Sequence, residues 1–233
     1  MEMSENLLAE VARAPAQTVF LNSATRLTCF LKRDPMTTSG ELTEDELKDV
    51  GLAVISGTIS AFRSNKGFAD KAISQLPDDK LHVALDVNTN SIAVIMKHLA
   101  GNLRSRWTDF LTTDGEKPWR NRDDEFVDTF TSRDRLVEYW ESGWATLFNS
   151  LSGLSSSDLA KSVIIRGEVH SVPLAMQRSL GHTTYHIGQI MLIARILAGD
   201  KWSTITIPRG GSASFNQNVW GAGHFQTPPE PEK

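Results

Sequence analysis

The strongest constraint on the fold is a run from about residue 173 to 197, which predicts one long helix. Ser171 is a suitable N-cap for it, and Pro173 is well tolerated in a first helical turn. Gly199 predicts the end of the helix, because glycine adopts the left-handed backbone conformation common after a last turn. The fold is therefore expected to be organised around this helix.

Three further segments repeat apolar residues every three or four positions, which indicates helices. Thr43 and Glu46 fit a capping box at the start of the first. Asn88 or Asn90 can cap the second, and Thr131 or Ser132 opens the third. The expected helices are residues 43–76, 90–110 and 131–151.

Between the third and fourth helices, residues 163–169 form a short apolar run broken by Gly167, which predicts a small β-hairpin or extended loop. The fold class expected is mainly α, a four-helix bundle over residues 43–216 with a small β-hairpin before the last helix. Residues 1–42 lack a sustained apolar period, so a weakly ordered N-terminal extension is expected there. Residues 217–233 are expected to be a flexible, proline-containing C-terminal tail.

Composition limits the compartment and the partners. The chain has 233 residues, which suits one domain with extensions, and a formal net charge of -4. That charge gives no reason to expect nucleic acid or a membrane surface as a partner. The single cysteine, Cys29, excludes a disulfide framework, and no apolar run is long enough to span a membrane. A cytoplasmic protein is therefore expected.

Three histidines predict a metal site. His182 and His186 are four residues apart, so their rings share one helix face, although this spacing is also common on partly exposed helices. His98 lies beside the apolar stripe of the second helix, where a hydrogen-bonded core histidine is the better explanation if it is considered alone. Together the three form a facial set that leaves an open coordination position, the mark of a catalytic metal site. The other histidines are not expected to be ligands: His82, His170 and His224.

Two familiar metal motifs are absent. A zinc metalloprotease needs H-E-x-x-H, and Thr183 stands where the glutamate would be. Di-iron bundles need Glu-x-x-His, but Ser179 and Thr183 precede the two histidines at that spacing. No carboxylate stands close in sequence to His182 or His186, so no general base and no catalytic residue is assigned.

Several polar residues near the histidines are candidates for contact with a small substrate. Asn102 lies one turn after His98, and Gln189 can brace a ligand imidazole, although core and dimer-packing roles explain them equally well. Arg178, four residues before His182, can hold a carboxylate, but a surface salt bridge is its commoner role. Arg106 and Arg120 share that ambiguity. The candidate set is Asn102, Arg178, Tyr185 and Gln189.

Several stretches resemble the DinB-like superfamily. The resemblance covers about residues 55–216, and its later segments are most similar to a single-domain bacterial branch. The stretches that carry it are residues 90–102 with Arg106 and Trp107, residues 182–190, residues 119–123 and residues 207–216.

The resemblance implies a four-helix bundle, usually a homodimer, in which His98, His182 and His186 bind a divalent metal. Zinc or nickel is favoured by affinity order, with iron and manganese left open. Similar proteins are transferases and isomerases whose metal activates a low-molecular-weight thiol such as bacillithiol or mycothiol. The expected function is thus a thiol-dependent S-transferase acting on small electrophiles. Two alternatives stay open, a non-catalytic metal-stabilised dimeric stress or ligand-binding protein and a metal-dependent hydrolase.

Overall fold

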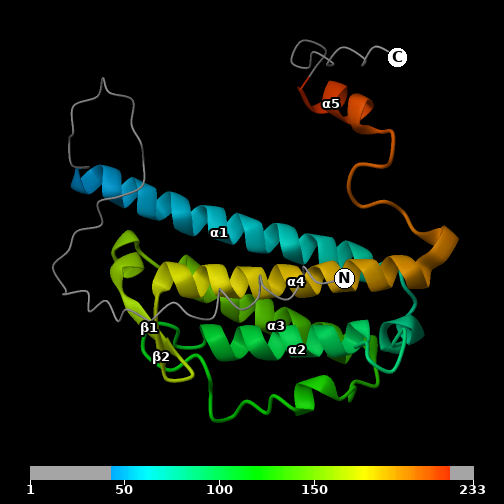
Figure 1. Cartoon of the computed structure of the whole chain (residues 1–233), viewed down its shortest axis with the longest axis horizontal. Helices are drawn as coiled ribbons and strands as arrows, with labels where there is room; N and C mark the ends of the chain where they lie inside the picture. The colour runs from blue at the N-terminus through cyan, green and yellow to red at the C-terminus, as the bar shows by residue number, and fades with distance from the viewer. Residues whose placement is uncertain (1–42, 221–233) are drawn as a thin grey trace, which may run out of the picture. The chain divides into compact units, whose positions relative to one another are not determined.

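The computed structural model describes residues 43–220, which form five α-helices and one two-stranded sheet (Figure 1). The predicted extension, residues 1–42, and residues 221–233 of the predicted tail lie outside the described part of the chain. The mainly α fold with a small hairpin before the long His-bearing helix is confirmed. The four long helices are α1 (Glu44–Ile73), α2 (Ile92–Trp107), α3 (Arg133–Ser152) and α4 (Val172–Ala198).

The four long helices pack as a bundle. Both α1 and α2 contact α3 and α4, and in Figure 1 the four lie side by side with similar inclinations. Aromatic rings fill the centre: Phe62 of α1 meets the rings of Trp107 and Trp144 edge to face at 6.3 and 6.4 Å. These fully buried rings supply much of the apolar area that drives the helices together.

The helix ends follow from local capping. The predicted capping box is present, because Glu46 N donates to Thr43 Oγ1 and Thr43 N donates to Glu46 Oε2. The cap of α2 is Ser91 rather than Asn88 or Asn90, with Val94 N donating to its hydroxyl at 3.2 Å. The remaining N-caps are Ser132 for α3 and Ser171 for α4, and Gly199 caps the end of α4.

The hairpin consists of β1 (Ser162–Ile165) and β2 (Glu168–Ser171), paired antiparallel. Its two turn residues, Arg166 and Gly167, have φ angles of 55° and 76°, as a two-residue hairpin turn requires. The carboxylate of Asp114 accepts hydrogen bonds from both of their backbone N–H groups at 2.8 Å. The hairpin tip is therefore fixed to the loop that follows α2.

A fifth helix, α5 (Ser212–Trp220), was not predicted. It has 9 residues and presents almost all of its described side chains to solvent, so it carries little apolar periodicity. Residues 217–220 of the predicted tail belong to it. Along residues 43–220, we find no helix with both the length and the apolar character of a membrane span.

The contact between α2 and α3 requires a glycine. A Cβ atom on Gly143 would lie 2.7 Å from Ala100 Cα and 2.9 Å from Ala100 O, and backbone atoms of a packed helix cannot move aside cheaply. We expect Gly143→Ala to lower the free energy of unfolding by about 1–3 kcal/mol through overpacking, despite alanine's higher helix propensity. Urea denaturation measures this change.

Gly57 on α1 is the matched control, because no packed neighbour within residues 43–220 has an atom within 4 Å of its Cβ position. There the same substitution should raise the free energy of unfolding by up to ~1 kcal/mol. Equal stability of the two variants would contradict the close approach of α2 and α3.

Candidate metal centre

Three histidine side chains from two helices gather at one point. His98 comes from α2 and is 4% exposed, while His182 and His186 come from successive turns of α4. One ring nitrogen of each lies within 4.8 Å of the others, and Nε2 of His98 is 3.2 Å from Nε2 of His182. Helical spacing explains why the α4 pair shares a face, whereas the packing of α2 on α4 supplies the third ring.

The spacing of these nitrogens fits a metal ion. Two nitrogens at tetrahedral positions around zinc, each ~2.0–2.1 Å from it, lie about 3.3 Å apart. The 3.2 Å between the Nε2 atoms of His98 and His182 is close to that separation. The histidines predicted as ligands therefore stand close enough together to hold one divalent ion.

Hydrogen bonds orient two of the rings. His98 Nδ1 donates to Glu125 Oε2 at 2.9 Å, and His186 Nδ1 donates to Gln189 Oε1 at 2.8 Å. A neutral imidazole that donates from Nδ1 has an unprotonated Nε2, the form that binds metal. His182 Nδ1 is buried without a hydrogen-bond partner in residues 43–220, and the His182 ring meets the rings of His98 and His186 edge to face.

Burial keeps the α4 pair neutral. Burial, together with the neighbouring His186, His98, Arg120 and Arg106 in that order, lowers the pKa of His182 to about 3. Burial also lowers the pKa of His186, against an opposing hydrogen bond to its neighbour on α4. Because a metal replaces the proton on its ligand, neutral imidazoles are ready to bind one without a competing deprotonation.

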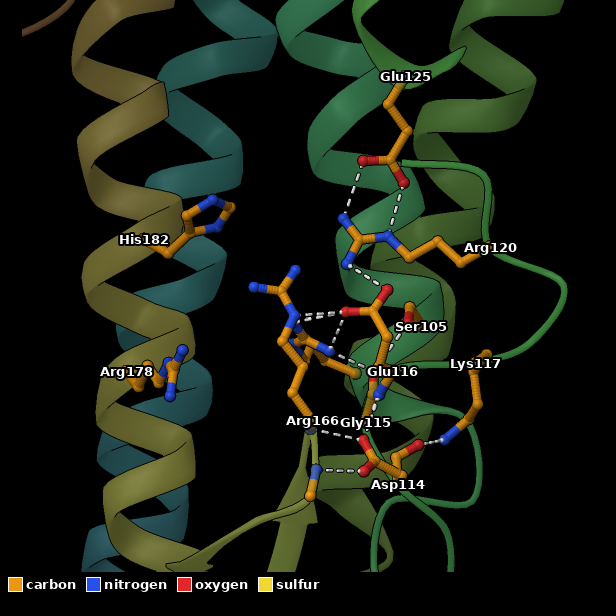
Figure 2. A network of polar contacts seen from close by, with 12 residues as sticks. Ser105, Asp114, Gly115, Glu116, Lys117, Arg120, Glu125, Arg166, Arg178 and His182 are labelled. Atoms are coloured by element: carbon orange, nitrogen blue, oxygen red, sulfur yellow. Dashed lines mark hydrogen bonds and ion pairs between the residues drawn. The ribbon is translucent and has the colours of Figure 1, made fainter. Parts of the chain in front are cut away.

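A carboxylate, Glu125, contacts the cluster, although no acidic residue stands near the α4 histidines in sequence. Besides accepting from His98, it forms a two-pronged ion pair with Arg120, with both N–O distances at 2.8 Å (Figure 2). Burial alone would raise the pKa of Glu125, but the hydrogen bonds from His98 and Arg120 outweigh it and hold that pKa below its ordinary value. Glu125 is thus an ionised brace for His98.

The short helix η3 (Asp124–Phe126), which carries Glu125, is fastened to α2 by a buried lysine. Lys97 Nζ donates to the backbone oxygen and the carboxylate of Asp124 at 2.6 and 2.7 Å, and to Val127 O and Thr129 Oγ1. Lys97 is 6% exposed, and these charge-assisted hydrogen bonds stand in for contacts with water. The loop therefore cannot lift Glu125 from His98 without exposing a buried charge.

Glu125 also depends on a glycine of α2. A Cβ atom at Gly101 would lie 2.3 Å from Glu125 Oε1 and 2.9 Å from its carboxyl carbon. Any larger residue at Gly101 would push the carboxylate away from Arg120 and His98. The absence of a side chain one turn after His98 is therefore what admits its hydrogen-bond partner.

A cavity of about 170 Å³ opens beside His98 and His182. Its other walls combine apolar side chains, among them Trp107 and Phe110, with Asn102 and several arginines. The arginines that line it are Arg106, Arg122, Arg166 and Arg178.

The candidate substrate residues divide into two groups. Asn102 and Arg178 line the cavity. Tyr185 is 64% exposed with its ring against that of His186, and Gln189 accepts the hydrogen bond from His186, so neither lines the cavity.

Sequence reasoning missed several residues of this region. His170, set aside as a ligand, is 8% exposed, and its Nε2 accepts a hydrogen bond from Arg178 at 2.8 Å. Glu125 follows Asp123 and Asp124, and an unbroken acidic run carries no signal for which carboxylate faces inward. Arg166 could have been noticed only from its place at a hairpin turn held by the loop that follows α2.

The fold and this centre define a class of helical-bundle protein with a three-histidine cluster opening onto an arginine-lined cavity. The chain belongs to the family described as "Protein of unknown function (DUF1572)", whose model matches residues 49–211. All three histidines lie within the matched residues. No curated protein and no solved structure matched the chain.

The pKa of His182 makes the stability of the metal-free protein depend on pH. Its value in the fold, about 3, lies below the ordinary 6.5, so between these values the unfolded chain binds the proton and the folded chain does not. This contribution is complete above about pH 6.5 and is lost as the pH falls toward 3. We expect the free energy of unfolding, measured by urea denaturation after chelation, to decrease across this window.

A His182→Gln variant isolates the effect, because glutamine keeps a polar side chain of similar size without a titrating proton. Its stability should fall less steeply with decreasing pH than that of the parent. Identical slopes would show that His182 is protonated as easily in the fold as in the unfolded chain.

Proposed function

We propose that this chain is a DinB-like metal-binding protein that acts as a thiol-dependent S-transferase on small electrophiles. The observation that carries the proposal is the position of the three-histidine cluster at one end of a cavity lined by arginines. His98, His182 and His186 would hold a divalent metal, with zinc or nickel favoured by affinity order. Such an ion, when bound, supplies an open coordination position that lowers the pKa of a thiol.

The nucleophile in this proposal comes from a small molecule. The sequence has one cysteine, Cys29, which lies outside the described residues, and the cavity lining within residues 43–220 includes no cysteine. A low-molecular-weight thiol, such as bacillithiol or mycothiol, would lose its S–H proton to solvent. Its sulfur would then form a bond to the electrophilic carbon as the leaving group departs with the electron pair of the broken bond.

The protein's own side chains position the reactants. Glu125 and Gln189 hold the rings of His98 and His186 in place, while Trp107 and Phe110 keep one side of the cavity apolar. Arg178 contributes a fixed positive charge to the cavity wall. Because the thiol proton goes to solvent, thiol deprotonation needs no general base from the protein. This agrees with the absence of a carboxylate among the described lining residues.

A non-catalytic alternative has one observation in its favour. Apart from the histidines, the described lining residues include no side chain that exchanges protons near neutral pH. A metal-stabilised ligand-binding protein needs none. A hydrolase is less well supported, because Glu125 is already bonded to His98 and Arg120 and does not line the cavity.

The homodimer stays a prediction; a monomeric mass by light scattering would contradict it.

Metal content tests the first part of the proposal. His98→Ala, or the same change at His182 or His186, should remove most of the metal measured by elemental analysis of purified protein. Glu125→Ala should weaken metal affinity by ~10–100-fold, because the orienting partner of His98 is lost. His82→Ala is the control, since His82 pairs with Asp128 and should leave metal content unchanged. Parent-like metal content in His98→Ala would refute the site.

Conjugation tests the second part. Metal-loaded protein should bind one of bacillithiol, mycothiol, glutathione or cysteine in calorimetry and should conjugate it to monochlorobimane. His186→Ala and metal-free protein should both lose this activity. Without thiol binding or turnover above the metal-free rate, the ligand-binding alternative takes the place of the transferase.

A further inference from the structure

The cavity is arranged in levels along two antiparallel helices. On α2 the lining residues His98, Asn102 and Arg106 are spaced four apart, and on α4 Arg178 lies four residues before His182. Each step of four residues is about 6 Å along a helix axis. The arginines thus lie about one and two turns, ~6–12 Å, from the histidines. Figure 2 shows Arg178 and His182 on α4, across from a polar network built mainly by the loop after α2 and by Arg166 of the hairpin turn.

The antiparallel direction of the two helices follows from a second contact. Trp107, toward the end of α2, donates from Nε1 to Oγ of Ser179, near the start of α4, at 3.1 Å. The end of α2 therefore meets the beginning of α4. Since the arginines on these helices occupy that same end, their charges converge instead of spreading along the bundle.

The described residues neutralise only part of the positive charge there. Within residues 43–220, four guanidinium groups and no carboxylate line the cavity. One acid, Glu116, is shared by three arginines: it accepts from Arg166 Nε at 2.8 Å, from Arg106 at 3.3 Å, and lies 3.5 Å from Arg120. Burial and the positive charges of Arg120 and Arg166 lower the pKa of Arg106 despite Glu116, which reflects this crowding.

Two of the lining arginines have no carboxylate partner anywhere in residues 43–220. Arg122 lies over the ring of Phe126, with its guanidinium carbon 5.7 Å from the ring centre. Arg178 is held by His170, whose Nδ1 donates to the backbone oxygen of Glu168, so that its Nε2 is free to accept from Arg178. Both guanidiniums are oriented by the protein while their charges remain uncompensated, as an anion-binding group requires.

We infer that this cavity is a subsite for the carboxylate or phosphate of a small acid, whose reacting group lies about one to two helical turns, ~6–12 Å, away at His98 and His182. The volume of about 170 Å³ is below the ~300–1,000 Å³ usual for drug-sized ligands, which fits a small acid. The apolar surfaces of Trp107 and Phe110 pack against the carbon chain that joins the two ends. This inference deepens the proposed function by defining the substrate or thiol as an anion.

The test uses the metal-free full-length protein, so that it does not depend on the metal. Calorimetric titration with succinate and with inorganic phosphate should show binding that weakens with salt, while the neutral analogue succinamide should not bind. Succinate binding alone indicates a carboxylate site, and phosphate binding alone indicates a phosphate site. Binding of neither acid would overturn the inference.

Substitutions locate the subsite. Arg178→Gln and Arg122→Gln should each weaken anion binding at least tenfold, and neither change leaves a carboxylate unpaired. Arg178→Lys should restore it only in part, because lysine keeps the charge but loses the planar fork. Arg135→Gln is the matched control, since Arg135 is an exposed arginine paired with Glu138 outside the cavity. Parent-like affinity in both Arg178→Gln and Arg122→Gln would place the anion elsewhere and refute the subsite.

Failure of this inference can be distinguished from failure of the proposed function. Arg178→Gln leaves the three histidines intact and should retain full metal content, while His98→Ala should keep anion binding. If anion binding is present but metal is absent from the parent protein, the subsite stands and the transferase does not. If metal is present and the acids do not bind, the metal centre stands and the subsite does not.

Discussion

The buried carboxylate of Glu125 connects the packing of the bundle to the candidate metal centre. It accepts from His98 and is clamped by Arg120, while Lys97 fastens the loop that carries it. Gly101 leaves the space that the carboxylate occupies. Buried ion pairs of this kind contribute little net stability, but removing one partner strands a charge in the interior. Their role here is geometric, because they fix one imidazole and the wall beside it.

The same region contains opposite electrostatic demands. A histidine must be unprotonated to bind a metal, and burial favours that form by lowering the pKa of His182 and His186. Arginines beside them add positive potential, which further disfavours protonated imidazole and attracts an anion. Glu116 offsets only part of this potential, because it is shared among several guanidiniums. Neutral imidazoles next to arginines whose charge is only partly offset would accommodate an anionic molecule. Its charged end would lie at the arginines and its uncharged or thiol end at the histidines.

The candidate site could be predicted only in part, for reasons visible on α4. Arg178 and Tyr185 are seven residues apart, so they lie within about 20° of each other around the helix axis. Periodicity therefore gave them equal standing, yet Arg178 lines the cavity and Tyr185 is 64% exposed. The two residues differ in position along the axis of α4. Residues of the hairpin line the cavity near the start of this helix, where Arg178 lies, and Tyr185 is farther along. Which part of α4 is covered depends on the hairpin and on the loop whose Asp114 holds the hairpin turn, and neither is encoded within α4.

By itself the sequence determined the elements that depend on contacts within one or two turns. The capping box at Thr43, the caps at Ser132 and Ser171, and the shared face of His182 and His186 are all of this kind. Tertiary structure decided the rest: His98 meets His182 across 84 residues and Glu125 across 27. Local spacing cannot specify such pairings, because they arise only when α2 packs against α4 and the intervening loop folds back. The three-histidine cluster, its contact with Glu125 and the arginine-lined cavity are therefore properties of the packed bundle.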